Sequence, residues 1–91
     1  MGAAEESRQA VSRHRSALSD LVHAVHELAD LVDACRRQLT ADGPIGRSAD
    51  PDLQRARTRL EVAHQRLLEA AHAAQASREP CQQFVERVFP P

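Results

Sequence analysis

Aromatic residues are nearly absent from this sequence. Its 91 residues include two Phe and no Tyr or Trp. A chain of this length forms a single small domain, over residues 1–91, whose core must be built from Leu, Val and Ala. Because such a core is close to the lower limit of independent stability, we expect the chain to associate with a second copy of itself.

Lysine is absent, and neither sign of charge is in clear excess. The chain carries 12 Arg residues against 13 Asp and Glu residues, so its net charge is −1. This balance gives no reason to expect a nucleic-acid partner, which would call for a basic patch. No apolar run approaches the roughly 18 to 20 residues of a membrane span, and residues 1–15 lack the hydrophobic segment of a secretory signal. We therefore expect no membrane partner.

Cysteine is scarce as well. Cys35 and Cys81 are too few and too far apart in sequence for a disulfide framework or for a Cys-x-x-Cys redox or zinc motif. The expectation that follows is a cytoplasmic protein with reduced thiols. The sequence has no glycine-rich phosphate loop, and neither cysteine has an obvious base beside it, so we expect neither an enzyme nor a bound cofactor.

Apolar residues recur with a seven-residue period in the first half of the chain. The pattern predicts a helix over residues 5–41, with two apolar rows that form a coiled-coil-like seam. His14, near the start, is the one polar residue in either row. The first row contains Val11, Leu18, Val25, Val32 and Leu39, and the second contains His14, Leu21, Leu28 and Cys35.

Turn-forming residues follow over residues 42–50, with Gly, Pro and Asp in close succession. Asp50 precedes Pro51, which predicts an N-cap followed by proline in the first helical position. A second helix is predicted over residues 51–78. Its seam has a row of mainly leucines and a row of mainly alanines, in which small residues let helix backbones approach closely. The rows are Leu53, Leu60, Leu67 and Ala74, and Ala56, Ala63, Ala70 and Ser77.

A connection of about ten residues predicts that the two helices pack antiparallel, so the expected fold is an all-α helical hairpin. Some apolar residues, such as Val22, Leu31 and Val62, lie to the sides of the seam. This width favours a homodimeric four-helix bundle over a bare hairpin, although scattered aliphatic residues are also normal on protein surfaces. The residues assigned to the core or dimer seam are Leu18, Leu21, Val25, Leu28, Val32, Leu60 and Leu67.

The segment 80–91 contains both Phe residues of the chain. Pro80 interrupts the second helix or begins a new turn. Four apolar residues after it share one face of a short helix: Phe84, Val85, Val88 and Phe89. This turn either folds back to cap the open end of the bundle or docks into the groove of an unidentified protein partner.

Metal ligands are candidates on the first helix, because four ligand-type residues fall within eight positions. These residues are His23, His26, Glu27 and Asp30. At 100° per residue they lie opposite the apolar stripe, whereas a metal site in a helical bundle needs ligands that project inward. Two Glu-x-x-His spacings on the second helix, at Glu61 and Glu69, are short and unspecific. The four residues are therefore weak candidates, and we expect no resident metal.

Six arginines lie near the turn. One interpretation is that Arg57 and Arg59 form ion pairs with Asp30 and Asp33 across the two helices and so fix their register. The other is a basic surface for a partner. The arginines assigned to that surface are Arg36, Arg37, Arg55 and Arg59.

A helical hairpin of this length, with its turn in mid-chain, is similar in outline to the small WXG100-type substrates of type VII secretion. In the turn Gly43-Pro44-Ile45-Gly46, Ile45 stands where that family has Trp. The tail has no Tyr for the family's Tyr-x-x-x-acid signal and offers Phe84 to Val88 in its place. The resemblance implies a secreted hairpin that pairs with a similar chain. The residues themselves favour a non-enzymatic adaptor or regulator that acts through a hairpin dimer, with a metal-binding bundle as a further alternative.

Overall fold

Three helices make up the computed structural model, which describes residues 2–41 and 43–88. They are α1 (Ala3–Thr40), α2 (Pro51–Ala76) and α3 (Arg78–Val88), and the described residues contain no strand. The predicted all-α class is therefore confirmed. The molecule is a rod that measures 66 × 16 × 16 Å.

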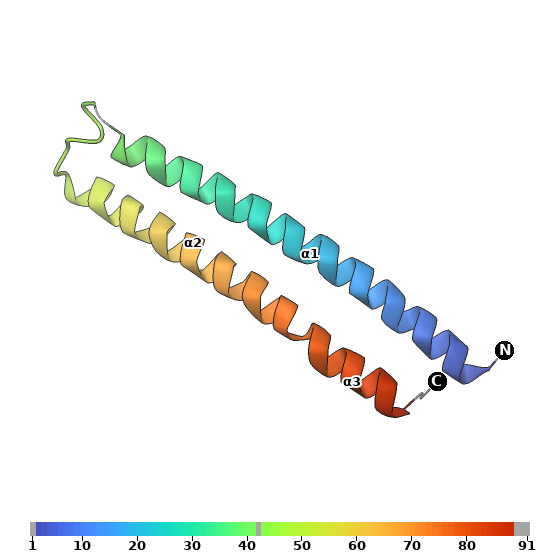
Figure 1. Cartoon of the computed structure of the whole chain (residues 1–91). Coiled ribbons are helices and arrows are strands. Elements are labelled where there is room, and N and C mark those ends of the chain that lie inside the picture. The colour runs from blue at the N-terminus through green and yellow to red at the C-terminus, as the bar shows by residue number, and fades with distance from the viewer. Residues whose placement is uncertain (1, 42, 89–91) are drawn as a thin grey trace.

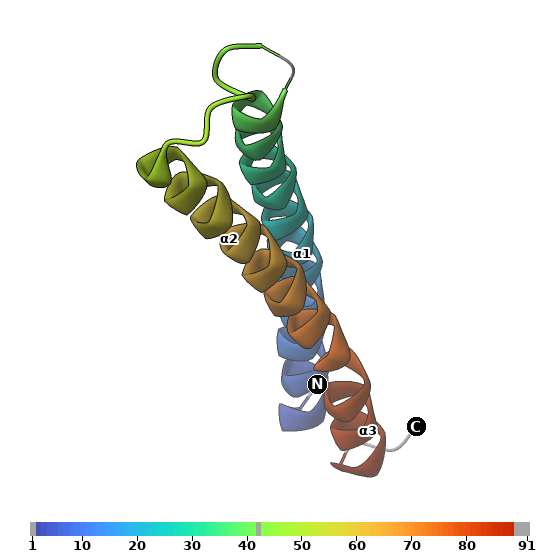
Figure 2. The same ribbon diagram turned by 90° about the vertical axis from the view of Figure 1, so that its left-hand side faces the viewer.

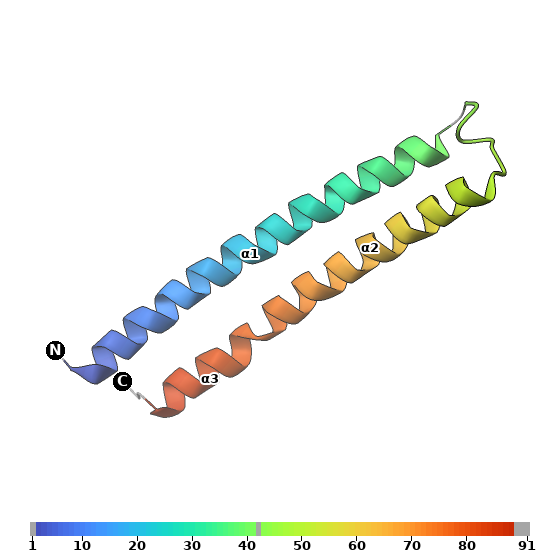
Figure 3. The same cartoon turned by 180° about the vertical axis from the view of Figure 1, so that it is seen from behind.

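The helices form two antiparallel arms. Figure 1 shows α1 as one arm, with α2 and α3 returning beside it in the opposite direction, and Figure 3 shows the same arrangement from behind. The start of α1 and the end of α3 lie at one end of the rod, and the connecting segment lies at the other. Figure 2, seen from the side, shows that the arms cross at a shallow angle. Contacts between the arms come mainly from α1 with α2, and α3 touches both of the other helices much less.

Pro80 explains why the second arm is divided into two helices. Proline has no N–H with which to bond the carbonyl four residues earlier, and its ring clashes with that carbonyl. The α2 helix accordingly ends at Ala76, Ser77 forms the junction, and Pro80 lies in the first turn of α3. The Ser77 hydroxyl donates to the Ala74 carbonyl at 2.7 Å, and the Cys81 amide donates to the Ser77 carbonyl at 3.3 Å. The helical path therefore resumes after one residue.

The start of α2 has the cap that the sequence predicts. The Asp50 carboxylate accepts hydrogen bonds from the backbone amides of Asp52, at 2.8 Å, and Leu53, at 3.4 Å. Pro51 occupies the first turn, where its missing N–H costs no hydrogen bond. The predicted N-cap is confirmed, and it fixes where the second arm begins.

The turn is closed by one side chain of the second arm, Arg57. Its guanidinium donates to the carbonyl of Leu39, at 2.9 Å from Nε and 2.7 Å from Nη2. The same group donates to the carbonyls of Ile45, Gly46 and Ser48 at 2.9, 3.1 and 3.5 Å. Carbonyls in the last turn of a helix have no partner within the helix, and a cation placed there also interacts favourably with the helix dipole. Arg57 therefore joins the end of α1, the connecting segment and α2.

Two glycines in the connecting segment meet requirements that other residues could not. Gly43 has a φ of +142°, a region that residues with a Cβ rarely adopt. A Cβ on Gly46 would overlap the carbonyl oxygen of Ala41. The chain can therefore fold tightly against the end of α1 only with glycine at these positions.

The contact between α1 and α2 is rotated from the predicted seam. Leu18, Val22, Ala29 and Ala71 are the buried apolar residues of the described chain. The first predicted row of α1, which contains Leu18 and Val25, does face α2. The second row of α1 in this contact contains Val22 and Ala29, where the prediction had Leu21 and Leu28. On α2, Ala71 is likewise buried, whereas its neighbour Ala70 is exposed.

The prediction that Leu21, Leu28 and Cys35 pack on the second arm is therefore wrong. The physical reason is side-chain size. Ala29 and Ala71 are each 1% exposed, and such small residues let the two backbones approach closely, whereas leucines in the same row would hold the helices apart. Leu21 and Leu28 each precede a buried residue by one position, so their side chains point about 100° away from it around the helix axis.

Replacing Arg57 with Lys tests the closure of the turn. Lysine keeps the charge but has a single ammonium in place of the planar fork of donors, so several of the carbonyls should lose their partner. We expect the free energy of unfolding, measured by urea denaturation, to fall by about 1 to 3 kcal/mol. Arg59→Lys, two residues away on the exposed side of α2, is the matched control and should change stability by less than about 0.5 kcal/mol. Equal effects of the two substitutions would contradict the role of Arg57.

Candidate interaction surface

One side of the rod carries a continuous apolar strip that we call the leucine–alanine face. On each arm, every residue of this strip stands one position before a residue that faces the other arm. Because the arms are antiparallel, residues at equivalent positions lie on the same side of the contact, so the two rows adjoin. The face consists of Leu21, Leu28 and Cys35 of α1 and of Ala56, Ala63 and Ala70 of α2.

The leucines of this face are largely exposed to solvent. Leu21 is 53% exposed and Leu28 is 48% exposed. Leu31, farther round α1, is 65% exposed, and Cys35 is also exposed. Single surface leucines are common, but a row of them along one helix beside a row of alanines forms a contiguous apolar patch. Exposed apolar patches of this kind are common at the interaction sites of proteins.

The seven residues assigned to the seam are now divided between two surfaces. Leu18 is buried, and Val25, Val32, Leu60 and Leu67 are half-buried between the arms. Leu21 and Leu28 belong to the leucine–alanine face. The prediction missed Val22, Ala29 and Ala71 as the centre of the contact. The sequence signal for them was a small or β-branched residue four positions after Leu18, Val25 and Leu67.

The outer end of the second arm carries a smaller apolar patch on α3. Phe84 is 46% exposed and Val88 is 44% exposed, while Val85 is half-buried. Phe89, which the sequence places with them, lies outside the described residues. The patch is therefore formed by Phe84 and Val88, with Val85 beneath them.

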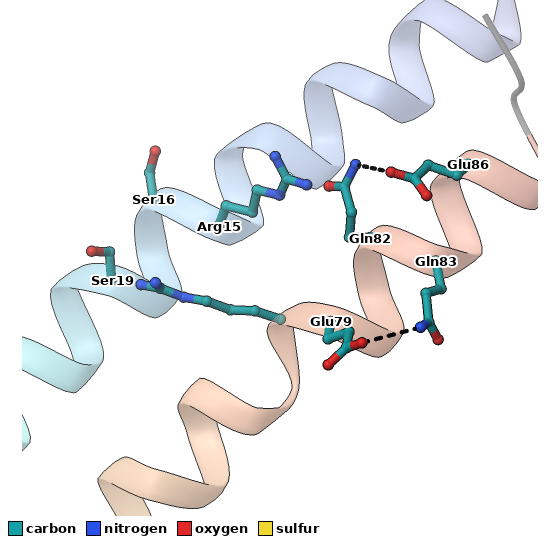
Figure 4. Close-up of a pocket in the computed structure, with 8 residues that line it drawn as sticks. Arg15, Ser16, Ser19, Glu79, Gln82, Gln83 and Glu86 are labelled. Atoms are coloured by element: carbon teal, nitrogen blue, oxygen red, sulfur yellow. Dashed lines mark hydrogen bonds between the residues drawn. The ribbon is translucent and has the colours of Figure 1, made fainter.

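A polar groove of about 780 Å³ separates α3 from α1. Figure 4 shows Gln82 of α3 extending toward Arg15 of α1, while Glu79 and Gln83 lie together on the other side of α3. Gln82 donates to Glu86 at 3.0 Å, and the buried Gln82 Oε1 has no hydrogen-bond partner among the described residues. Polar side chains of both signs line the groove, so its walls select no ligand of a single charge.

The arginines near the turn are mainly engaged within their own helices. Asp33 accepts hydrogen bonds from Arg36, the shorter at 2.7 Å, and lies 3.3 Å from the Arg37 guanidinium. Arg55 pairs with Asp52. Arg59 is exposed.

The predicted ion pairs between the arms are wrong. Asp33 pairs with arginines one turn ahead on α1, and Arg57 donates to backbone carbonyls instead. Residues three and four positions apart on a helix are already neighbours, so this pairing needs no alignment of the two arms. Register at the turn is therefore fixed by Arg57 and not by cross-helix ion pairs.

The histidine cluster lies on the outer side of α1, away from the second arm. His23, His26, Glu27 and Asp30 are all exposed. His23 Nε2 lies 3.1 Å from the Glu27 carboxylate, an exposed pair one turn apart. Within residues 2–41 and 43–88, no three His, Cys, Asp or Glu side chains come together as a metal site would require.

Comparisons of the chain with protein-family models, with curated proteins and with solved structures find no match. In the described part of the chain, no helix combines the length and the apolar character that crossing a membrane requires.

Acid titration tests the Asp33 cluster. The hydrogen bond from Arg36, assisted by the charges of Arg36 and Arg37, holds the pKa of Asp33 below its ordinary value of 3.8. A lowered pKa stabilises the fold above pH 3.8, and this stabilisation is lost as the pH falls through the folded-state pKa. The difference in free energy of unfolding between wild type and Asp33→Asn should therefore be constant above about pH 5 and shrink below pH 3.8.

Asp30→Asn is the control for this titration, since it removes an exposed carboxylate from the same helix. Urea denaturation at a series of pH values supplies the measurement for both variants. A difference between wild type and Asp33→Asn that does not change between pH 5 and pH 2 would show that the Asp33 carboxylate does not interact with its arginines in the folded state.

Proposed function

We propose that this protein is a non-enzymatic protein–protein interaction module, a small adaptor or regulator that acts through a helical-hairpin dimer. Two copies would form a four-helix bundle. The observation that carries the proposal is the leucine–alanine face, where Leu21 and Leu28 are about half exposed on a rod with little buried core.

Burial energetics support a dimer. Four buried apolar residues, two of them alanines, form the core between the arms. Complete burial of one leucine side chain stabilises a fold by about 1.5 to 3 kcal/mol, so covering the leucine rows of two copies adds several kcal/mol. Small helical domains commonly gain stability by such association.

The α3 patch supports a second contact, with a different protein. If α3 served as a cap, its apolar residues would be covered by the arms, yet Phe84 and Val88 are both exposed. An aromatic and a β-branched residue one turn apart resemble the anchors with which short helices enter a groove. This arrangement favours docking over capping for the C-terminal helix.

Light scattering tests the dimer. The chain has a mass of 10.0 kDa, so wild type should scatter as a particle of twice that mass. The double variant Leu21→Gln/Leu28→Gln removes the two apolar side chains but keeps the helix, because Gln has a high helix propensity. We expect its dimer dissociation constant to rise at least about 100-fold. Val62→Gln, an exposed apolar position outside the face, is the control and should remain dimeric. Wild type that stays at 10.0 kDa at millimolar concentration would exclude the proposal.

Truncation after Arg78 separates the two roles of the second arm. This truncation removes nearly all of α3 and leaves the α1–α2 contact intact. We expect the shortened chain to remain helical by circular dichroism and dimeric by light scattering, with a loss of stability below about 2 kcal/mol, because the removed side chains are mostly exposed. Loss of the fold would instead show that α3 acts as a structural cap.

A further inference from the structure

Large and small residues alternate in a regular way across the leucine–alanine face. Leu21 and Ala70 each stand 19 residues from the turn ends of their helices, which are Thr40 and Pro51. Leu28 and Ala63 each stand 12 residues from those ends, and Cys35 and Ala56 each stand five. The helix rise is the same in both arms, so each height along the rod has one larger side chain on α1 beside one alanine on α2.

We propose that a second copy of this chain covers the face with both turns at the same end. The α1 row of each copy then lies over the alanine row of the other copy's α2. This inference rests on the proposed dimer and adds the orientation of its two copies.

Size complementarity is the first argument for this orientation. Rotation by 180° about the long axis of the rod exchanges the two arms, so each leucine of one copy meets an alanine of the other. Well-packed cores alternate large and small side chains across facing positions in this way. With the turns at opposite ends, α1 would lie over α1, leucine would oppose leucine, and the two faces would be held apart along one edge.

The second argument is that the apolar strip lies off-centre. Leu28, Leu31 and Cys35 all lie in the half of α1 nearer the turn. In the other half, the same row of α1 contains the exposed His14. Copies that overlap fully with their turns at opposite ends would place Leu28 against His14. When the turns lie at the same end, the apolar section of one copy faces the apolar section of the other along its whole length.

Two rods that overlap along their full length share enough area for a stable dimer. The rod is 66 Å long and 16 Å wide, so full overlap covers a projected area of about 1,000 Å² on each copy. Stable protein interfaces bury about 800 Å² per partner. Sliding oppositely oriented copies until Leu28 meets Leu28 would shorten the overlap by about a third, which leaves less than that area.

A two-fold axis along the rod also explains why the occupant is a second copy. An isologous interface requires a surface that is complementary to itself, in which residue i meets residue j and j meets i. The leucine and alanine rows meet this requirement, because each copy supplies both the larger and the smaller side of every layer.

Distances between spin labels on the two copies test the orientation. We would label Cys35 alone in Cys81→Ser, and position 10 alone in Ala10→Cys/Cys35→Ser/Cys81→Ser, and measure each dimer by pulsed electron paramagnetic resonance. Both positions are exposed on the same flank of α1 in the single chain, and Cys35 belongs to the face that the second copy is proposed to cover. With the turns at the same end, labelled residues lie at equal heights across a bundle, and both separations should be below about 30 Å.

Each separation joins the same labelled residue in the two copies. The two labelled positions are 25 residues apart, which is about 37 Å along the helix. With the turns at opposite ends, the two separations along the axis therefore add up to at least about 75 Å. One of them must then exceed about 37 Å, and this result would overturn the orientation while leaving the proposed dimer intact. No measurable coupling from labelled protein at 10.0 kDa would overturn both. If a label itself lowers the mass, Ser12→Cys and Arg37→Cys on the outer side of α1 provide a second pair with the same spacing. Two separations that are both shorter than about 37 Å then support the proposal.

Discussion

The hydrogen bonds from Arg57 to the end of α1 and to the connecting segment are the constraint on which the rest of this structure depends. Two long helices with a thin core can slide along each other at little energetic cost, because each apolar residue meets a similar one a heptad away. Arg57 removes this freedom at the turn, since its guanidinium binds Leu39 and Ser48 together. Gly46 complements it by allowing the chain to lie against Ala41.

Once the turn is fixed, side-chain size determines which faces meet. Alanines at positions 29 and 71 permit a close approach of the two backbones, and Val22 completes the contact. The leucines adjacent in sequence are then left on a neighbouring face. Packing the alanines between the arms therefore leaves the leucines on the apolar surface that a second chain is proposed to cover.

The helices and their ends were predictable from sequence, because they depend on local signals. The seven-residue period, the Asp50–Pro51 cap and the disruption at Pro80 act within a few residues. The buried row was not predictable with the same ease. Leu21 and Val22 are both apolar and differ by one residue's rotation, so hydrophobicity alone does not decide between them. The role of Arg57 depends on carbonyls 18 and 12 residues away, a relation that a local pattern does not contain.

The use of arginine at the turn has a consequence for how the two arms respond to their surroundings. A guanidinium stays protonated throughout the pH range in which proteins function, unlike an imidazole. The joint between the arms therefore does not respond to proton concentration. The spacing of the arms at the turn should thus stay constant across that pH range.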